Sequence, residues 1–133
     1  SMLKSAEKNN DINSISLGSK LEGDLTSNGD VRVDGCLSGS VKTEKKLVLG
    51  ERGVIEGEVY CKNAIIAGEL KASIKVEGLL TLRATAKLSG EIVAGQLAVE
   101  PGAIFSGKCS MGPVVKNIKT GEKNLTSQKE KTA

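Results

Sequence analysis

The sequence contains no histidine and no tryptophan, and its 133 residues include only one tyrosine and one phenylalanine. The absence of histidine removes the commonest general base, metal ligand and pH-sensitive side chain, which argues against many classes of enzyme. With so few aromatic side chains, any core must be built from Leu, Ile, Val and Ala. Sixteen glycines accompany them, and this composition favours a narrow, repetitive core.

The three cysteines, Cys36, Cys61 and Cys109, are far apart and form no Cys-x-x-Cys pair. This spacing indicates neither a disulfide framework nor a zinc site, and it favours a reducing compartment. No apolar run approaches the ~18 residues of a membrane-spanning helix, and the N-terminus lacks the apolar core of a secretory signal. We therefore expect a cytosolic chain with one folded domain, no metal and no cofactor.

A short segment with a central glycine recurs along the chain: "LEGDL" at Leu21 returns as "LSGSV" at Leu37, "IEGEV" at Ile55 and "LSGEI" at Leu88. The central position is held in turn by Gly23, Gly39, Gly57, Ala72, Gly90 and Gly107. An apolar pair precedes each of them: Ile15/Leu17, Val31/Val33, Leu47/Leu49, Ala64/Ile66, Leu80/Leu82 and Leu97/Val99. A third position follows: Ser27, Thr43, Cys61, Val76, Ala94 and Met111. Six units thus follow one template.

Within each unit, apolar and polar residues alternate with a period of two, and turn-forming pairs such as Asn28-Gly29 separate the runs, which indicates strands. A unit of about 17 residues is too short for a propeller blade or a helical hairpin, but it suits one turn of a β-solenoid with two or three short faces. We therefore predict an all-β rod of about six turns, stacked at ~4.8 Å.

The glycine inside each strand has two possible explanations, which are a positive φ and a need for space where groups approach closely. Because Ala72 fills one of the six positions, we favour the need for space in the interior. On this hypothesis Gly57→Ala would be mild, whereas Gly57→Leu would overpack and unfold the rod.

The strands, the turns "VRVDGCLSGSV" and "LVLGERGVIEGEV", and the closing "LAVEPGAIFSGKCSM" resemble a bactofilin domain. The resemblance implies a right-handed, three-faced parallel β-helix flanked by disordered tails. It also implies a bacterial cytoskeletal protein that polymerises without nucleotide, head to head and tail to tail, into nonpolar filaments. We accordingly expect a disordered tail at residues 1–14, the bactofilin β-helix at 15–112 and a disordered lysine-rich tail at 113–133.

No polar capping repeat is recognisable at either end of the predicted rod, so the first and last turns would expose apolar side chains and strand edges. Such ends are a route to end-to-end association. We predict polymerisation contacts at Leu97, Val99, Phe105, Cys109 and Met111 in the C-terminal turn, and at Ile15, Leu17, Leu21 and Leu25 in the N-terminal turn. The only phenylalanine either fills the core of the last turn, takes part in the contact, or does both.

Three further features of the sequence are open to two interpretations each or rest on the resemblance alone. Val48 and Ile65 are expected side by side on the outside, either as a lateral patch or as ordinary scattered surface residues. Met2, Leu3 and Lys4 are similar to the N-terminal membrane-targeting stretch of some bactofilins, and a polymer would multiply such weak affinity. The C-terminal lysines either keep a tail soluble or meet anionic lipid.

Other functions fit the sequence less well. Hexapeptide-repeat acyltransferases depend on a histidine base, and a nucleic-acid binder would carry a basic face with aromatic stacking residues. The resemblance implies a homopolymer that acts as a scaffold for cell shape or cell-wall machinery. Its implied partners are the chain itself, the cytoplasmic face of the inner membrane and cell-wall-modifying enzymes, with no nucleotide. The alternative is a non-polymerising β-solenoid scaffold or adaptor that localises partner proteins.

Overall fold

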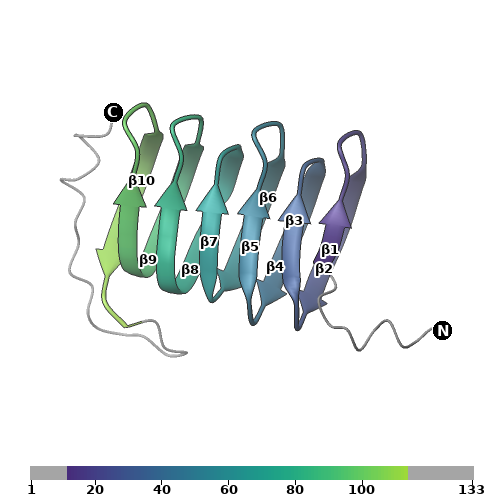
Figure 1. Cartoon of the computed structure of the whole chain (residues 1–133), viewed down its shortest axis with the longest axis horizontal. Helices are drawn as coiled ribbons and strands as arrows, with labels where there is room; N and C mark the ends of the chain where they lie inside the picture. Colours follow the sequence, from purple (N-terminus) through teal and green to yellow (C-terminus); the bar gives the residue numbers. More distant parts are fainter. Residues whose placement is uncertain (1–11, 114–133) are drawn as a thin grey trace.

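A computed structural model describes residues 12–113, which form a rod made of strands with no helix in that range (Figure 1). The strands are β1 (Ile12–Ile15), β2 (Lys20–Ser27), β3 (Asp30–Val33), β4 (Cys36–Thr43), β5 (Lys46–Leu49), β6 (Val54–Cys61), β7 (Asn63–Ile66), β8 (Glu69–Leu82), β9 (Lys87–Val99) and β10 (Ile104–Met111). Residues 1–11 and 114–133, where most of the two expected tails fall, lie outside the described range.

Every strand pairing is parallel. The four-residue strands stack on one another as β1, β3, β5 and β7, and the eight-residue strands stack as β2, β4 and β6. We call the eight-residue segment of each turn its long arm and the four-residue segment its short arm. Strands β8 and β9 each contain the long arm of one turn and the short arm of the next, so they continue both stacks. Strand β10 completes the stack of long arms. The prediction of a parallel β-solenoid with six turns is confirmed.

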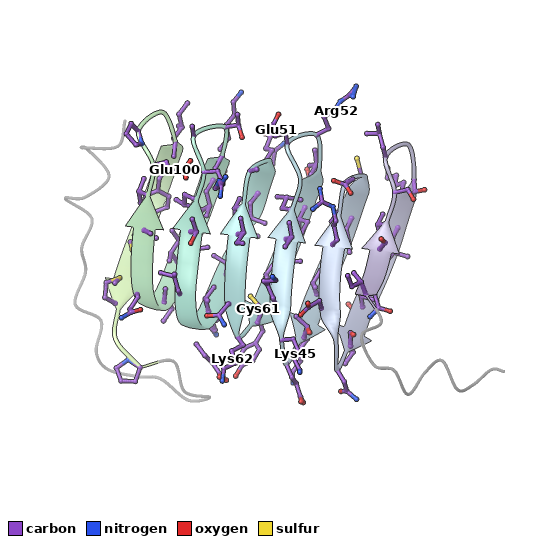
Figure 2. The ribbon with its side chains drawn as sticks, viewed as in Figure 1. Lys45, Glu51, Arg52, Cys61, Lys62 and Glu100 are labelled. Atoms are coloured by element: carbon purple, nitrogen blue, oxygen red, sulfur yellow. The ribbon has the colours of Figure 1, made fainter. Side chains whose placement is uncertain are left out.

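Loops of two lengths join the short arm to the long arm. Two residues separate β3 from β4 and β7 from β8, whereas four residues separate β1 from β2, β5 from β6, β8 from β9 and β9 from β10. Each four-residue loop is closed by a backbone hydrogen bond, for example from Gly53 N to the carbonyl of Gly50 at 3.0 Å. These loops, which include Glu51 and Arg52, form one edge of the rod, opposite the edge that carries Lys45 and Lys62 (Figure 2). The change in loop length, together with one or two residues at the opposite corner, explains why the repeat is not constant.

The core consists of the inward columns of the stack. Side chains one above another in a column are nearly all inaccessible, as in Val33, Leu49 and Ile66, each 0% exposed. The glycine column also has the predicted register, with Gly39 paired to Gly57, Gly57 to Ala72 and Ala72 to Gly90. A core of aliphatic side chains therefore runs through the middle of the rod.

The predicted register of the first turn is wrong. Asn13 and Ile15, rather than Ile15 and Leu17, pair with Val31 and Val33. Leu17 lies in the four-residue loop after β1 and is 55% exposed. A shift of two residues preserves the alternation of inward and outward side chains, so the pattern of apolar residues alone permits both registers.

The explanation of the glycine column by interior space is also wrong. Gly57 is exposed and has a φ of 133°, and the other glycines of the column have φ values of 138° to 140°. A Cβ atom on Gly57 would come within 1.8 Å of the carbonyl oxygen of Gly39 in the preceding turn. Each glycine of the column therefore permits a positive φ, and from the second turn on it also permits close stacking of backbone on backbone, which a side chain would oppose.

Candidate polymerisation surfaces

The N-terminal end of the rod is formed by β1 and β2, each of which has a strand neighbour on one side only within the described residues. Ile15, Leu21 and Leu25 occupy inward columns directly against Val33, Leu37 and Val41 of the second turn. They remain partly exposed, whereas their partners are at most 1% exposed. The difference arises from position, because a residue in the first turn is covered from one side.

Of the four residues predicted at this end, Leu17 is the one outside the inward columns. Asn13 takes the column position instead and donates a hydrogen bond from Nδ2 to Ser27 Oγ at 2.6 Å. One corner of the N-terminal face is therefore polar. The signal that could have identified Asn13 is the loop "SLGS", which has the length of the later loop "GERG" between β5 and β6.

The C-terminal end is formed by β10 and the last residues of β9. Leu97, Val99 and Met111 lie in inward columns against Leu80, Leu82 and Ala94 and are partly exposed. Each end of the rod thus presents three partly buried apolar side chains beside an open strand edge. An open edge of this kind is a template for pairing with another chain.

Phe105 and Cys109 lie in the same turn but are more enclosed. Phe105 is 6% exposed and packs in register with Leu88, and Cys109 is 0% exposed in register with Ile92. Burial raises the pKa of the Cys109 thiol. These two residues therefore shape the last turn from within, while the side chains available for contact are Leu97, Val99 and Met111.

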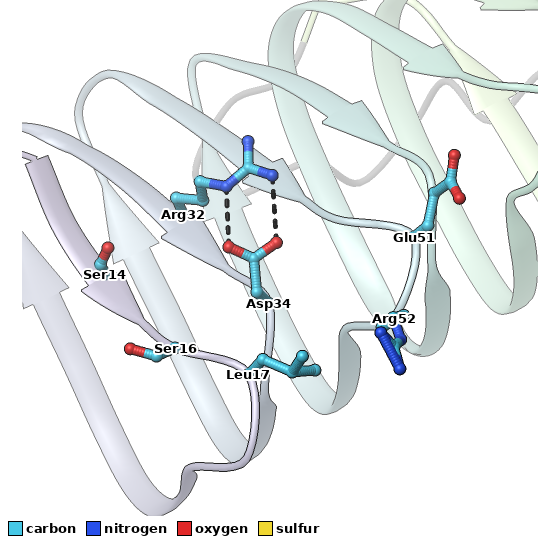
Figure 3. A pocket seen from close by; sticks show the side chains of 7 residues that line it. All are labelled: Ser14, Ser16, Leu17, Arg32, Asp34, Glu51 and Arg52. Atoms are coloured by element: carbon cyan, nitrogen blue, oxygen red, sulfur yellow. Dashed lines mark hydrogen bonds and ion pairs between the residues drawn. The ribbon is translucent and has the colours of Figure 1, made fainter.

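The side of the rod has shallow hollows. Val48 and Ile65, expected as neighbours, are paired in register, and both are partly buried in the floor of a hollow bordered by Arg32 and Arg83. A second hollow lies between Leu17, Arg32 and Glu51 (Figure 3).

The guanidinium group of Arg32 is already engaged at the second hollow. Its Nε and Nη2 donate to the two carboxylate oxygens of Asp34 at 2.8 and 3.0 Å. Hydrogen bonding and the charge of Asp34 raise the pKa of Arg32. The positive charge is therefore compensated within the chain, and the ends of the rod are the stronger candidates for a functional surface.

Within residues 12–113, no helix is long and apolar enough to cross a membrane. The same part of the chain contains no cluster of three or more acidic or cysteine side chains arranged to hold a metal ion. The predicted membrane residues Met2, Leu3 and Lys4 lie outside the described range.

Curated relatives of this chain are known in Myxococcus xanthus strain DK1622. Bactofilin BacP is 29% identical over 110 residues, which cover 83% of this chain and 46% of BacP. Bactofilin BacO is 24% identical over 91 residues, which cover 68% of this chain and 72% of BacO. The chain thus spans about half the length of BacP.

Two solved structures of a bactofilin also match this chain. The cryo-EM reconstruction of Thermus thermophilus bactofilin double helical filaments matches with a TM-score of 0.72 and 35% identity, over 75% of this chain and 99% of that chain. The crystal structure of an F105R mutant of the Thermus protein matches with a TM-score of 0.64 and 33% identity, over 68% of this chain and 100% of that chain. The sequence model of the bactofilin family, described as polymer-forming cytoskeletal, matches residues 13–110. The chain belongs to the bactofilin family of cytoskeletal proteins.

Proposed function

We propose that this chain polymerises end to end, without nucleotide, through the faces of its first and last turns. The observation that carries the proposal is the loss of burial in the inward columns at both ends of the rod. Val33 is 0% exposed in the second turn, whereas Ile15, in the same column of the first turn, is partly exposed. Leu80 and Leu97 show the same relation at the other end.

The size of these faces indicates what the contact must include. Complete burial of a Leu, Ile or Val side chain contributes about 1.5–3 kcal/mol, so the six half-buried side chains of two opposed faces contribute roughly 4.5–9 kcal/mol. Association itself costs on the order of 4–15 kcal/mol. Side-chain burial alone therefore leaves the contact marginal. Hydrogen bonding between the open strand edges of the two copies supplies the remaining stabilisation in our proposal.

The family relationship supports polymerisation, since the bactofilin family is polymer-forming and the Thermus relative forms double helical filaments. We further propose that the filament is nonpolar, with like ends in contact. Leu97, Val99, Phe105, Cys109 and Met111 form or shape one contact in this proposal, and Ile15, Leu21 and Leu25 form the other.

The two end faces can be tested separately. Ile15→Arg and Leu97→Arg each place a charge in one face, and Ser14→Arg and Ala98→Arg are matched controls because they lie one residue away, on the outward side of the same strands. We expect the controls to form filaments visible by negative-stain electron microscopy. Phe105→Arg is less informative, because Phe105 is 6% exposed and its replacement also threatens folding.

Sedimentation of the face variants distinguishes polar from nonpolar filaments. If like ends meet, Leu97→Arg leaves the N-terminal faces intact and the protein stops at dimers, as does Ile15→Arg through the C-terminal faces. If unlike ends meet, either substitution leaves monomers. Filaments of normal length with Leu97→Arg and Ile15→Arg would contradict the proposed contacts. A wild-type chain that sediments only as a monomer would favour the alternative, a non-polymerising adaptor.

In the cell, we propose that the filament acts as a cytoplasmic scaffold rather than as an enzyme. Its function would be to organise cell shape or the cell-wall machinery through recruited proteins, at or near the inner membrane. A fluorescent fusion carrying Leu97→Arg tests this role, since a filament-dependent scaffold loses its localisation when assembly is blocked.

A further inference from the structure

One edge of the rod gathers lysines from three successive turns. We call it the lysine edge and define it by Lys42, Lys45, Lys46, Lys62 and Lys75, all of which are exposed. Lys42 and Lys75 lie in one outward column, on either side of Tyr60. The backbone N–H of Lys62 donates to the carbonyl of Lys45 at 2.9 Å, which stacks these two residues at the corner itself. Figure 2 shows both at the same edge.

The charges of the lysine edge are not compensated by ion pairs. None of its five lysines makes a salt bridge within residues 12–113. Three carboxylates lie at the same corner. Asp30 accepts the backbone N–H of Lys46 at 3.2 Å, and Glu77 accepts the Tyr60 hydroxyl. The carboxylate of Glu44 makes no hydrogen bond or ion pair within residues 12–113. The edge therefore has a net charge of +2, although residues 12–113 as a whole carry twelve basic and twelve acidic side chains.

Apolar and amphipathic side chains stand among these lysines. Ile12, Asp30, Lys46 and Asn63 follow one another in a single outward column. The side chain of Asn63 accepts the backbone N–H of Leu79 in the next turn. Ile12 is 58% exposed and Leu79 is 38% exposed, and they are two of the four large exposed hydrophobic residues in the described range. Lys42 Nζ lies 5.7 Å from the centre of the Tyr60 ring. Lysine, tyrosine and exposed aliphatic residues together are typical of a surface at the boundary between water and lipid.

Both described chain ends also lie at this edge. Ile12 is paired with Asp30 at the start of β1, and after β10 the N–H of Gly112 donates to the carbonyl of Ala94 at the same corner. Both ends of the described part of the chain therefore lie at the lysine edge.

We propose that the lysine edge is the surface by which the rod lies on an anionic lipid bilayer. The partner is lipid rather than nucleic acid because a single-strand binder relies on several stacking aromatic residues, and Tyr60 alone is available here with its hydroxyl bound to Glu77. A second rod is a poorer partner, since pairing like edges would oppose lysines to lysines. The inference rests on the proposed filament, because polymerisation repeats a weak edge many times along one line.

Flotation of the full-length protein with vesicles tests the lysine edge. The vesicles contain phosphatidylglycerol and phosphatidylcholine in equal parts, or phosphatidylcholine alone. The variant K45Q/K62Q removes two charges from the lysine edge, and R52Q/K87Q is the matched control because it removes two unpaired charges from the opposite, loop edge. Neutral glutamine avoids creating new like-charge pairs, and electron microscopy of each variant monitors filament formation.

We expect the wild type to float with the anionic vesicles and not with the neutral ones. K45Q/K62Q should weaken this binding roughly 30-fold, high salt should weaken it further, and R52Q/K87Q should change it little. Leu79→Ser should also weaken flotation without any change in charge.

Three results would overturn the proposal. The first is equal flotation of K45Q/K62Q and the wild type. The second is an equal loss in K45Q/K62Q and R52Q/K87Q, because net charge would then suffice. The third is side-by-side association of filaments without vesicles that K45Q/K62Q abolishes, because the edge would then bind another rod. Absence of filaments in the wild type would contradict the proposed polymerisation, whereas the dependence of flotation on Lys45 and Lys62 would still be measured.

Discussion

The substitution Gly57→Ala tests both the backbone stacking and the positive φ in the glycine column. A Cβ atom at this position would lie 1.8 Å from the carbonyl oxygen of Gly39, and the φ of 133° is one that side chains rarely adopt. Backbone strain of this kind costs about 1–3 kcal/mol, and overpacking costs a further 1–3 kcal/mol or so. We therefore expect the free energy of unfolding to fall by roughly 2–6 kcal/mol, measured by urea denaturation with far-ultraviolet circular dichroism.

Gly23→Ala separates the two causes. Gly23 has nearly the same φ, 138°, but it lies in the first turn and a Cβ atom there would have nothing within 4 Å. The loss of chain entropy in the unfolded state is the same for both variants and cancels in the comparison. Gly23→Ala should thus show the strain alone, and Gly57→Ala should be less stable by about 1–3 kcal/mol. Equal stability of the two variants would refute the stacking explanation, and a Gly57→Ala protein as stable as the wild type would refute both.

Three further predictions concern single side chains. The hydrogen bond to Glu77 raises the pKa of Tyr60, so ultraviolet titration of this single tyrosine should give a midpoint above the usual value of about 10, which Glu77→Gln should lower. Thr43 is 0% exposed and its hydroxyl donates to a backbone carbonyl of the preceding turn, so Thr43→Val should lose about 1–3 kcal/mol of stability in urea denaturation and Thr43→Ser less. Burial raises the pKa of Cys61 to about 12, so a thiol reagent at neutral pH should modify the exposed Cys36 in the folded protein and Cys61 only after unfolding.

The arrangement of the core could be predicted from the sequence because the core repeats. An inward position has the same requirement in every turn, so an apolar residue recurs there, as Val31, Leu47 and Leu80 do. The glycine column gave the alignment of the turns, and the pairing of Val48 with Ile65 follows from it. The alternation of apolar and polar residues predicts which side chains face inward, and the position of the central glycine predicts which side chains stack on one another.

The register of the first turn could not be predicted, because the sequence permits two loop lengths after the first strand. With a two-residue loop, Leu17 would occupy the inward column, and with the four-residue loop that the structure has, Ile15 does. Both residues are apolar and both choices keep the alternation intact. Within residues 12–113 no strand stacks on the outer side of β1, so no earlier strand in this range restricts the choice.

The reason for the glycines could not be predicted from residue size alone. In the sequence, Ala72 indicates that a positive φ is not needed in this column. In the structure Ala72 is 8% exposed, whereas Gly57 is exposed and its Cβ direction points along the rod at Gly39. Conformation at one position of a column therefore does not transfer to its neighbours. The column that joins Lys42 to Lys75 in the lysine edge is predictable once the turns are aligned on their central glycines.

An end face is built from the same columns as the core, so residue type cannot identify it and only the position within the stack can. Val33 and Ile15 illustrate this, since they are neighbours in one column and differ in whether a turn covers them. Val33→Arg would bury a charge at a site with 0% exposure and should abolish folding, as judged by circular dichroism. In the Ile15→Arg variant, the charged end of the arginine can point toward solvent. This variant should therefore keep the circular dichroism spectrum of the folded protein and lose only assembly. If both variants unfold, the first turn belongs to the core rather than to an interface. If Ile15→Arg still assembles, the N-terminal face is not the contact, and if Val33→Arg folds, the column does not enclose Val33 as the structure has it.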